Sequence, residues 1–177
     1  MTGPSLVMLI RHGEKPPPSG EAPLGVTADG TKDKHSLTVR GWTRAGALIG
    51  FFATAHDGVE PPTKIYAAMA DTGGPHGRRA SETVTPLAEA ANIPLDLSIA
   101  VGNEADLATA ILADEGVVLV SWEHHNIPVI VRALGVADFS LTWPDDRFDL
   151  VWICRQTPGG WNFSQIGQHL LGSDKEP

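Results

Sequence analysis

Short apolar runs alternate along the chain with stretches in which apolar residues recur every three or four positions. The runs at 5–10 and 117–122 are almost wholly apolar, which is typical of central strands buried on both faces. Because strand and helix patterns alternate, we expect an α/β fold: a three-layer α/β/α sandwich with a mostly parallel central sheet and helices on both faces. Further strands are predicted at 64–68, 148–154 and 160–163, and helices at 39–52, 80–91, 103–112 and 126–134.

Residues suited to helix ends agree with these boundaries. Thr38, Asn103 and Asn126 stand where a side chain can cap the first turn of a helix. Gly135 stands where the last predicted helix should end, a position that favours glycine. The polar end of the chain, 172–177, is expected to be frayed.

Composition narrows the class of protein. A length of 177 residues suits one domain, and 42% hydrophobic residues with 19% charged ones give enough apolar material to fold, which excludes disordered and fibrous structures. No apolar run reaches the ~18 residues of a membrane span and no signal-peptide pattern opens the chain, so we expect a soluble, cytoplasmic protein. The net charge of −8 argues against a broad nucleic-acid surface. The single cysteine, Cys154, lies in a strand pattern and is expected to be a buried thiol.

Arginine and histidine side chains follow three of the predicted strands, at the edge where open α/β sheets bind ligands. Guanidinium groups grip phosphoryl oxygens in a fixed fork, and the helix start at Asn126 adds free backbone N–H groups. The pattern predicts an anion site in which a neutral imidazole can also act as a nucleophile near pH 7. The residues at the strand ends are Arg11 and His12, Arg78 and Arg79, and Glu123 and His124.

Two connections rich in glycine and proline flank this edge. The first, 14–36, is long for a structureless loop and begins just after His12. Two interpretations stay open for it: a loop that covers the substrate, and a connection without a function of its own. The second is the short stretch 70–77. We expect Lys34 and His76 to reach the mouth of the site from these two loops.

Four motifs occur in a recognisable order between residues 6 and 134. They are Arg-His-Gly at 11–13 after the first strand, Leu-Thr-x-x-Gly at 37–41 with an alanine at 45, Arg-Ala-x-x-Thr at 79–83, and a histidine, His124, at the end of a hydrophobic strand. In this order they resemble the histidine phosphatase superfamily, also called the phosphoglycerate mutase-like family. The family commonly has His-Gly at the last position, where this chain has His124-His125; we expect His124 to enter the pocket, because it directly follows the strand and Glu123.

The resemblance implies a role for each matched residue. His12 would attack the substrate phosphorus and carry a phosphohistidine, while Arg11, Arg79 and His124 would hold the equatorial oxygens. No metal or cofactor is required by this chemistry, which rests on in-line positioning and charge stabilisation. Gly13, Arg78 and His125 complete the candidate substrate-binding set, although for Arg78 a surface ion pair is the favoured alternative.

A leaving alkoxide also needs a proton, which the family usually takes from an acidic residue whose position varies. Glu14 and Glu123 are the carboxyl groups nearest in sequence to the two site histidines. Asp71 and Glu104 lie on loops that could reach the same edge of the sheet. The sequence leaves these four alternatives open, because it does not show which surroundings raise a carboxyl pKa.

The function predicted from these residues is metal-independent hydrolysis of phosphomonoesters. The expected substrate is a small phosphorylated metabolite or a phosphoprotein, with no nucleic acid and no membrane as partner, and both a monomer and a homodimer fit the sequence. Phosphoglycerate-mutase-type phosphotransfer is a weaker alternative, because the chain is near the compact core of the family. A catalytically silent phosphate-binding module is another. Zinc bound by His124 and His125 beside Glu123 is the least favoured, because adjacent residues rarely point to one ion.

Overall fold

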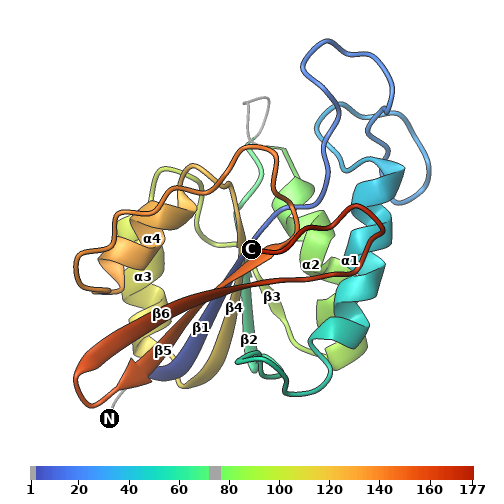
Figure 1. The fold of residues 1–177 in the computed structure, drawn as a ribbon. Coiled ribbons are helices and arrows are strands. Elements are labelled where there is room, and N and C mark those ends of the chain that lie inside the picture. The colour runs from blue at the N-terminus through green and yellow to red at the C-terminus, as the bar shows by residue number, and fades with distance from the viewer. Residues whose placement is uncertain (1–2, 72–76) are drawn as a thin grey trace.

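The computed structural model describes residues 3–71 and 77–177, which form one six-stranded sheet with helices packed on both faces (Figure 1). The order of the strands across the sheet is β3-β2-β4-β1-β5-β6. The elements are β1 (Pro4–Arg11), α1 (Val39–Phe51), β2 (Lys64–Ala67), α2 (Arg79–Ala91), β3 (Leu95–Asp96), α3 (Glu104–Ala113), β4 (Gly116–Trp122), α4 (Ile127–Ala133), β5 (Leu150–Thr157) and β6 (Gly160–Gly167).

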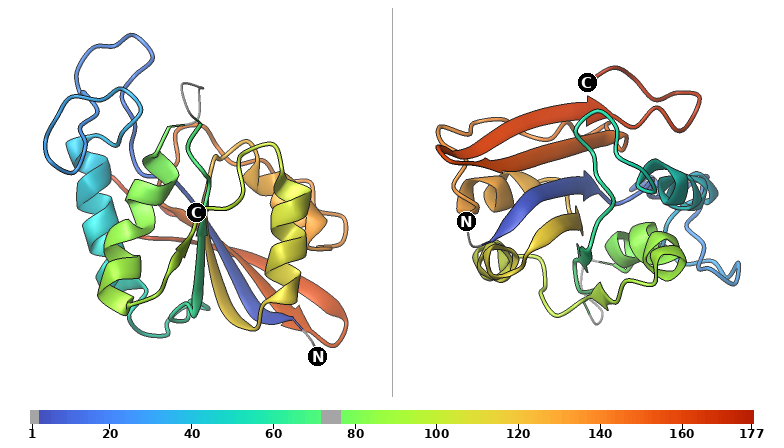
Figure 2. Two further views of the ribbon diagram at one scale, coloured as in Figure 1. Left: turned by 180° about the vertical axis from the view of Figure 1, so that it is seen from behind. Right: turned by 90° about the horizontal axis from the view of Figure 1, so that it is seen from below.

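The sheet is mostly parallel, as predicted. Strands β3, β2, β4 and β1 run in the same direction, whereas β5 and β6 are antiparallel to their neighbours. Helices α1 and α2 pack together on one face, and α3 and α4 pack together on the other (Figures 1 and 2). The three-layer α/β/α sandwich expected from the alternating pattern is therefore confirmed.

The two apolar runs form the centre of the sheet. Strands β1 and β4 are neighbours, and their register pairs Ile10 with Ser121 and Arg11 with Trp122. Their side chains are buried on both faces, which explains why these runs lack the alternation of a half-exposed strand. Because the two strands end level with each other, the residues that follow them emerge side by side at one edge.

The structure confirms several of the predicted boundaries. The Thr38 side chain accepts a hydrogen bond from the Gly41 backbone N–H at the start of α1, and Gly135 takes a φ of 93° after α4. Asn103 and Asn126 also stand at helix starts, but neither side chain caps its helix. Cys154 is buried in β5, and burial raises the pKa of its thiol to about 12. Within residues 3–71 and 77–177, no helix is both long and apolar enough to span a membrane.

The expectation that the chain end is frayed is wrong. Asp174 forms an ion pair with the buried Arg44, at 2.8 Å between Oδ1 and Nη2, and the backbone N–H of Lys175 donates to Asp149. The Arg147 guanidinium donates to the backbone carbonyls of Lys175 and Glu176. Polar residues here serve as ion-pair and hydrogen-bond partners for buried groups, so their polarity does not indicate a loose end.

Candidate active site

His12 is the first residue beyond β1 and lies in a buried position. Its backbone N–H donates to the Trp122 carbonyl at 3.1 Å, and its ring is only 4% exposed. Nδ1 lies 2.8 Å from the Gly13 carbonyl oxygen, so a proton on Nδ1 satisfies that acceptor and leaves Nε2 with a free lone pair. Burial, together with the charges of Arg79 and Arg11, lowers the pKa of His12 to about 3. The ring is therefore neutral at pH 7, the state in which imidazole is nucleophilic.

Arg11 is the last residue of β1 and lies beneath the loop that precedes β5. Its Nη1 donates to the backbone carbonyls of Asp145 (2.6 Å) and Arg147 (3.2 Å), and its guanidinium carbon lies 3.8 Å from the centre of the Phe148 ring. Burial lowers its pKa to about 10, which still leaves the group charged at pH 7. The buried Nε–H has no hydrogen-bond partner among the described residues.

Arg79, the first residue of α2, brings a second guanidinium to this edge. Its Nη1 donates to the backbone carbonyl of Lys34 at 3.3 Å, while its buried Nε–H has no partner within the described part of the chain. Burial lowers its pKa. Side chains of His12, Arg79 and Glu123 line one small cavity here. Two arginines thus keep a buried donor free beside a neutral histidine, which is the arrangement expected for an anion site.

His124, not His125, is the buried histidine at the end of β4. The His125 side chain is 66% exposed, whereas that of His124 is 3% exposed. The His124 ring lies between two carboxylates, with Nδ1 2.6 Å from Glu123 Oε1 and Nε2 3.0 Å from Asp145 Oδ1. Of the two histidines that the sequence offered, the structure thus buries His124 and exposes His125.

Glu123 is ionised at neutral pH. Partial burial alone would raise the pKa of its carboxyl group, but the contact with His124 and the hydrogen bond from the His125 backbone N–H lower it to about 2. A group with such a pKa holds no proton to give near pH 7. It places a negative charge beside His124, whose buried Nδ1 makes no well-directed hydrogen bond to the described residues.

Two other predicted acids are held in structural contacts. The Glu14 carboxylate accepts hydrogen bonds from Arg44 and Arg40, with the shortest contact at 2.8 Å. The buried Glu104 Oε1 accepts from Trp122 Nε1 (3.0 Å) and Asn126 Nδ2 (2.9 Å). The sequence placed Glu14 near the chemistry because it follows His12 by two positions, but its carboxylate instead anchors the start of α1.

Arg78 lies outside the cluster around His12. The Arg78 side chain is exposed and its Nε lies 3.6 Å from Asp33, so the second arginine of the pair, Arg79, alone enters the cavity. Asp71 is half-buried at the edge of the described residues. His76 falls outside the described residues, whereas Lys34 contributes its backbone carbonyl to Arg79.

The motif residues are held together by a hydrogen bond and by close packing at two glycines. The backbone N–H of Gly13 donates to Thr83 Oγ1 at 2.8 Å, which links the Arg-His-Gly turn to the last residue of Arg-Ala-x-x-Thr. A Cβ on Gly41 would lie 2.6 Å from the Glu14 carbonyl oxygen, so only glycine lets α1 approach this turn. Gly13 has a place in this packing, because a Cβ there would lie 3.1 Å from the Gly41 carbonyl oxygen.

Sequence reasoning missed Asp145, Thr83 and Lys15. Asp145 lies on an exposed loop with no pattern to mark it, and it reaches the site only because β5 pairs with β1. Thr83 was part of a motif, but its hydrogen bond depends on how α2 meets the turn after His12. Burial and the charges of Arg11 and Arg79 lower the pKa of Lys15, which identifies it as another cation near the site.

One set of side chains has the composition of a metal site. Within residues 3–71 and 77–177, Glu123, His124 and His125 are the group whose donor atoms lie within 4.8 Å of one another. Histidine and carboxylate donors suit zinc. Asp145, whose Oδ1 lies 3.0 Å from Nε2 of His124, is a further carboxylate beside this group.

No protein-family model and no curated protein sequence matches the chain. The solved structures with similar folds include two phosphatases. A candidate alpha-ribazole-5'-P phosphatase from Escherichia coli K-12 is 10% identical, with a TM-score of 0.57 over 96% of this chain and 99% of that one. The protein histidine phosphatase SixA, solved with tungstate, is 16% identical, with a TM-score of 0.56 over 92% of this chain and 97% of that one. The chain therefore has the phosphoglycerate mutase-like fold of histidine phosphatases, in agreement with the resemblance in its motifs.

Proposed function

We propose that this protein is a phosphatase that hydrolyses phosphomonoesters through a phosphohistidine on His12. The observation that carries the proposal is the buried, neutral His12 beside Arg11 and Arg79, each of which keeps a buried Nε–H free of any partner among the described residues. Unpaired buried donors are costly, and an anion that accepts from both would remove that cost. The fold shared with histidine phosphatases supports the same chemistry.

In the proposed reaction, Nε2 of His12 attacks the phosphorus in line with the leaving oxygen. The N–P bond forms as the P–O ester bond breaks, and the leaving oxygen takes a proton to give an alcohol. Water then attacks the phosphohistidine, which releases inorganic phosphate and returns Nε2 to its neutral state. Arg11, Arg79 and His124 would bind the three equatorial oxygens, whose charge grows in the transition state.

The candidates for the residue that donates a proton to the leaving oxygen are narrowed by the contacts of the carboxyl groups. Glu123 is ionised, and the carboxylates of Glu14 and Glu104 are held by arginine or by buried N–H donors. Asp71, on the connection that leaves β2, and Asp145, beside His124, are the carboxyl groups that these contacts leave for the role.

The test is phosphate release from 4-nitrophenyl phosphate and a panel of phosphorylated metabolites, at pH 4–9 in EDTA. His12→Ala should lose at least ~10³-fold in kcat, as removal of a covalent nucleophile does. His169→Ala, which changes an exposed histidine, is the matched control. A phosphoenzyme that is acid-labile and base-stable should form in the wild type and be absent from His12→Ala.

Other outcomes separate the alternatives. Phosphate transfer to an added alcohol in preference to water would favour a mutase-type reaction. Binding of inorganic phosphate or tungstate with no turnover of any ester would favour a silent binding module. Activity abolished by EDTA and restored by zinc would overturn the proposed mechanism and favour a metal site at His124 and His125.

A further inference from the structure

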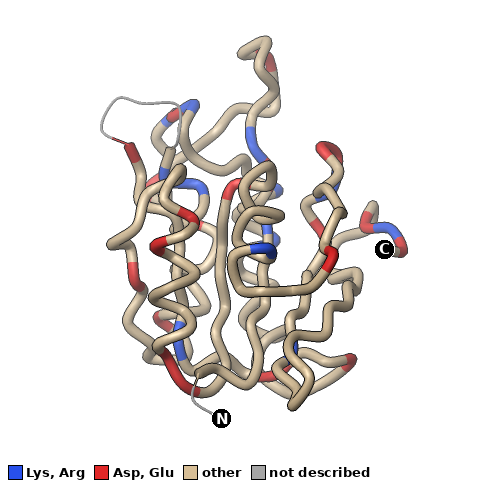
Figure 3. The backbone as a smooth tube through the Cα atoms, turned by 90° about the vertical axis from the view of Figure 1, so that its left-hand side faces the viewer, with Lys and Arg blue, Asp and Glu red and all other residues tan. Residues whose placement is uncertain are grey.

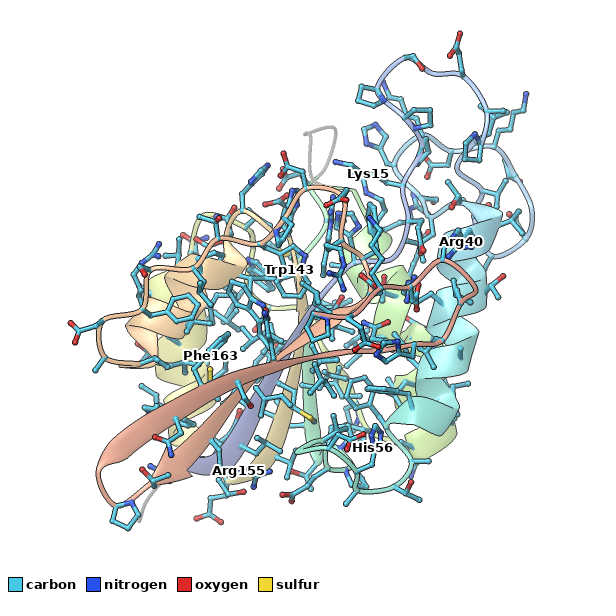
Figure 4. The ribbon with its side chains drawn as sticks, viewed as in Figure 1. Lys15, Arg40, His56, Trp143, Arg155 and Phe163 are labelled. Carbon is cyan, nitrogen blue, oxygen red and sulfur yellow. The ribbon has the colours of Figure 1, made fainter. Side chains whose placement is uncertain are left out.

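A cavity beside the site is formed largely by the long loop between β1 and α1. It encloses about 520 Å³ and is lined on one side by Pro16, Pro17, Pro18 and Leu24. Arg79 lines both this cavity and the small one at His12, so the two are adjacent. The loop projects beyond the carboxyl ends of the strands, and Lys15 lies at its base (Figures 1 and 4). A ligand held by Arg79 at His12 can therefore extend into this cavity.

Three lysines, Lys15, Lys32 and Lys34, line the cavity, which we call the lysine pocket. Among the described residues, no carboxylate lies within 4.0 Å of any of these three ammonium groups. The two other lysines of the chain are both paired, Lys64 with Asp96 at 3.0 Å and Lys175 with Asp146 at 3.3 Å. All the lysines without an acidic partner in the described structure thus gather at one pocket.

The one acidic residue of the lining does not cancel this charge. The Asp33 carboxylate accepts hydrogen bonds from the His35 backbone N–H (2.9 Å) and from Ser36 Oγ (3.0 Å), and it also pairs with Arg78. Its charge is therefore directed toward its own loop and toward α2.

The concentration of positive charge stands out against the rest of the molecule. The chain carries a net charge of −8, yet four of its 13 lysines and arginines line this single cavity. Many of the basic positions lie in the upper half of Figure 3, at the end of the molecule where the strands finish. Cations that line one concave, partly apolar surface focus their potential into it and attract anions.

We propose that the lysine pocket binds a second acidic group of the substrate, carried on the part that leaves as the alcohol. The substrate class is then an organic phosphate that bears a carboxylate or a second phosphate. The three prolines that line the pocket would contact the carbon skeleton of the substrate. The volume of the pocket lies within the range of small-molecule sites. This inference rests on the proposed function, because it takes the scissile phosphate to be bound at His12.

Binding of non-hydrolysable phosphonates tests the pocket independently of catalysis. Calorimetry would compare alkylphosphonates of four, six and eight carbons with the same chains ending in a carboxylate or in a second phosphonate. The diacids should bind about tenfold more tightly at the best length, and Lys32→Met and Lys34→Met should each reduce this preference about two- to fivefold, the range of an exposed ion pair. Arg132→Met, which removes an exposed charge on α4 outside the pocket, should keep the preference.

Equal affinities for monoacids and diacids, or an equal loss of preference in Arg132→Met, would overturn the inference. The preferred diacid identifies whether the second group is a carboxylate or a phosphate. The corresponding phosphate esters, assayed by kcat/KM, separate the two proposals. If no ester is hydrolysed but the diacids still bind more tightly, the proposed function fails and the pocket stands. If His12-dependent hydrolysis shows no preference for diacids, the pocket fails and the function stands.

Discussion

The backbone N–H of Gly13 donates a hydrogen bond to the hydroxyl of Thr83 across 2.8 Å. The same hydroxyl donates to the Arg79 carbonyl at 2.7 Å, one turn earlier in α2. Thr83 therefore joins the turn that carries His12 to the helix that carries Arg79. Through this one side chain, the positions of the proposed nucleophile and of the arginine proposed to bind phosphoryl oxygens depend on each other.

Thr83→Val should weaken both folding and catalysis. The substitution keeps the shape of the side chain but leaves the buried Gly13 N–H without its acceptor, at a cost of about 1–3 kcal/mol in the free energy of unfolding. We expect kcat to fall as well, because the turn after His12 loses its anchor. Urea unfolding and phosphatase assays measure the two effects. Thr83→Ser should restore both, and Thr85→Val, on the same helix, should cost less; equal effects at 83 and 85 would contradict this role.

The buried His12 should make the protein less stable in acid. In the unfolded chain His12 takes up a proton near its ordinary pKa of 6.5, but the folded protein does not protonate it until about pH 3. Because the unfolded state binds more protons in this window, stability falls as the pH drops from 6.5 toward 3. The unfolding free energy of wild type relative to His12→Asn should fall by about 2 kcal/mol between pH 7.5 and 5. A parallel pH dependence in the two proteins would show that His12 protonates normally; His169→Asn serves as the exposed control.

Arg44→Met should destabilise the fold far more than Arg40→Met, although both arginines pair with Glu14. The Arg44 side chain is 2% exposed and lies 2.8 Å from Asp174, whereas that of Arg40 is 43% exposed and lies 3.8 Å from Asp174. Removing Arg44 leaves Glu14 and Asp174 with the exposed Arg40 as their remaining cationic partner in the network, at a cost of about 3–5 kcal/mol. Removing Arg40 should cost no more than about 1 kcal/mol. Urea unfolding of the two variants checks the difference, and similar values would show that Arg44 is not the centre of this network.

Asp145→Ala should tighten the binding of inorganic phosphate. The Asp145 carboxylate contacts His124 Nε2, a donor that the proposed mechanism assigns to a phosphoryl oxygen, and its negative charge opposes an anion there. We expect the inhibition constant for phosphate to fall about two- to fivefold, the size of an exposed ion-pair interaction. Asp146→Ala, which removes an exposed neighbouring charge that pairs with Lys175, is the matched control. Unchanged or weaker inhibition in Asp145→Ala would contradict competition at His124.

Much of the fold was predictable because its central strands are continuous apolar runs. Strands β1 and β4 and helix α2 match the expected segments to within one or two residues. Strand β3 was missed because it is two residues long, Leu95–Asp96, and both are only half-buried. Too little of it is apolar or periodic to signal a strand.

The candidate site was predictable where residues stand at or just beyond the ends of central strands, as Arg11, His12 and His124 do. The roles of the acidic residues were harder to predict, because the partners that decide the role of a carboxylate are distant in sequence. Glu14 is adjacent to the site along the chain, yet its partner Arg44 lies 30 positions away. The lysine pocket depends likewise on how a long loop folds back over itself, which periodicity does not describe.

The contacts of Arg11 have a consequence for how the protein matures during synthesis. This arginine belongs to the first strand, but the carbonyls that hold its guanidinium lie 134 and 136 positions later in the chain. A nascent chain that has emerged only as far as α4 already contains His12, Arg79 and His124 but lacks the groups that orient Arg11. Competence to bind an anion should thus arise late in translation, only after the ribosome has released the segment that leads into β5.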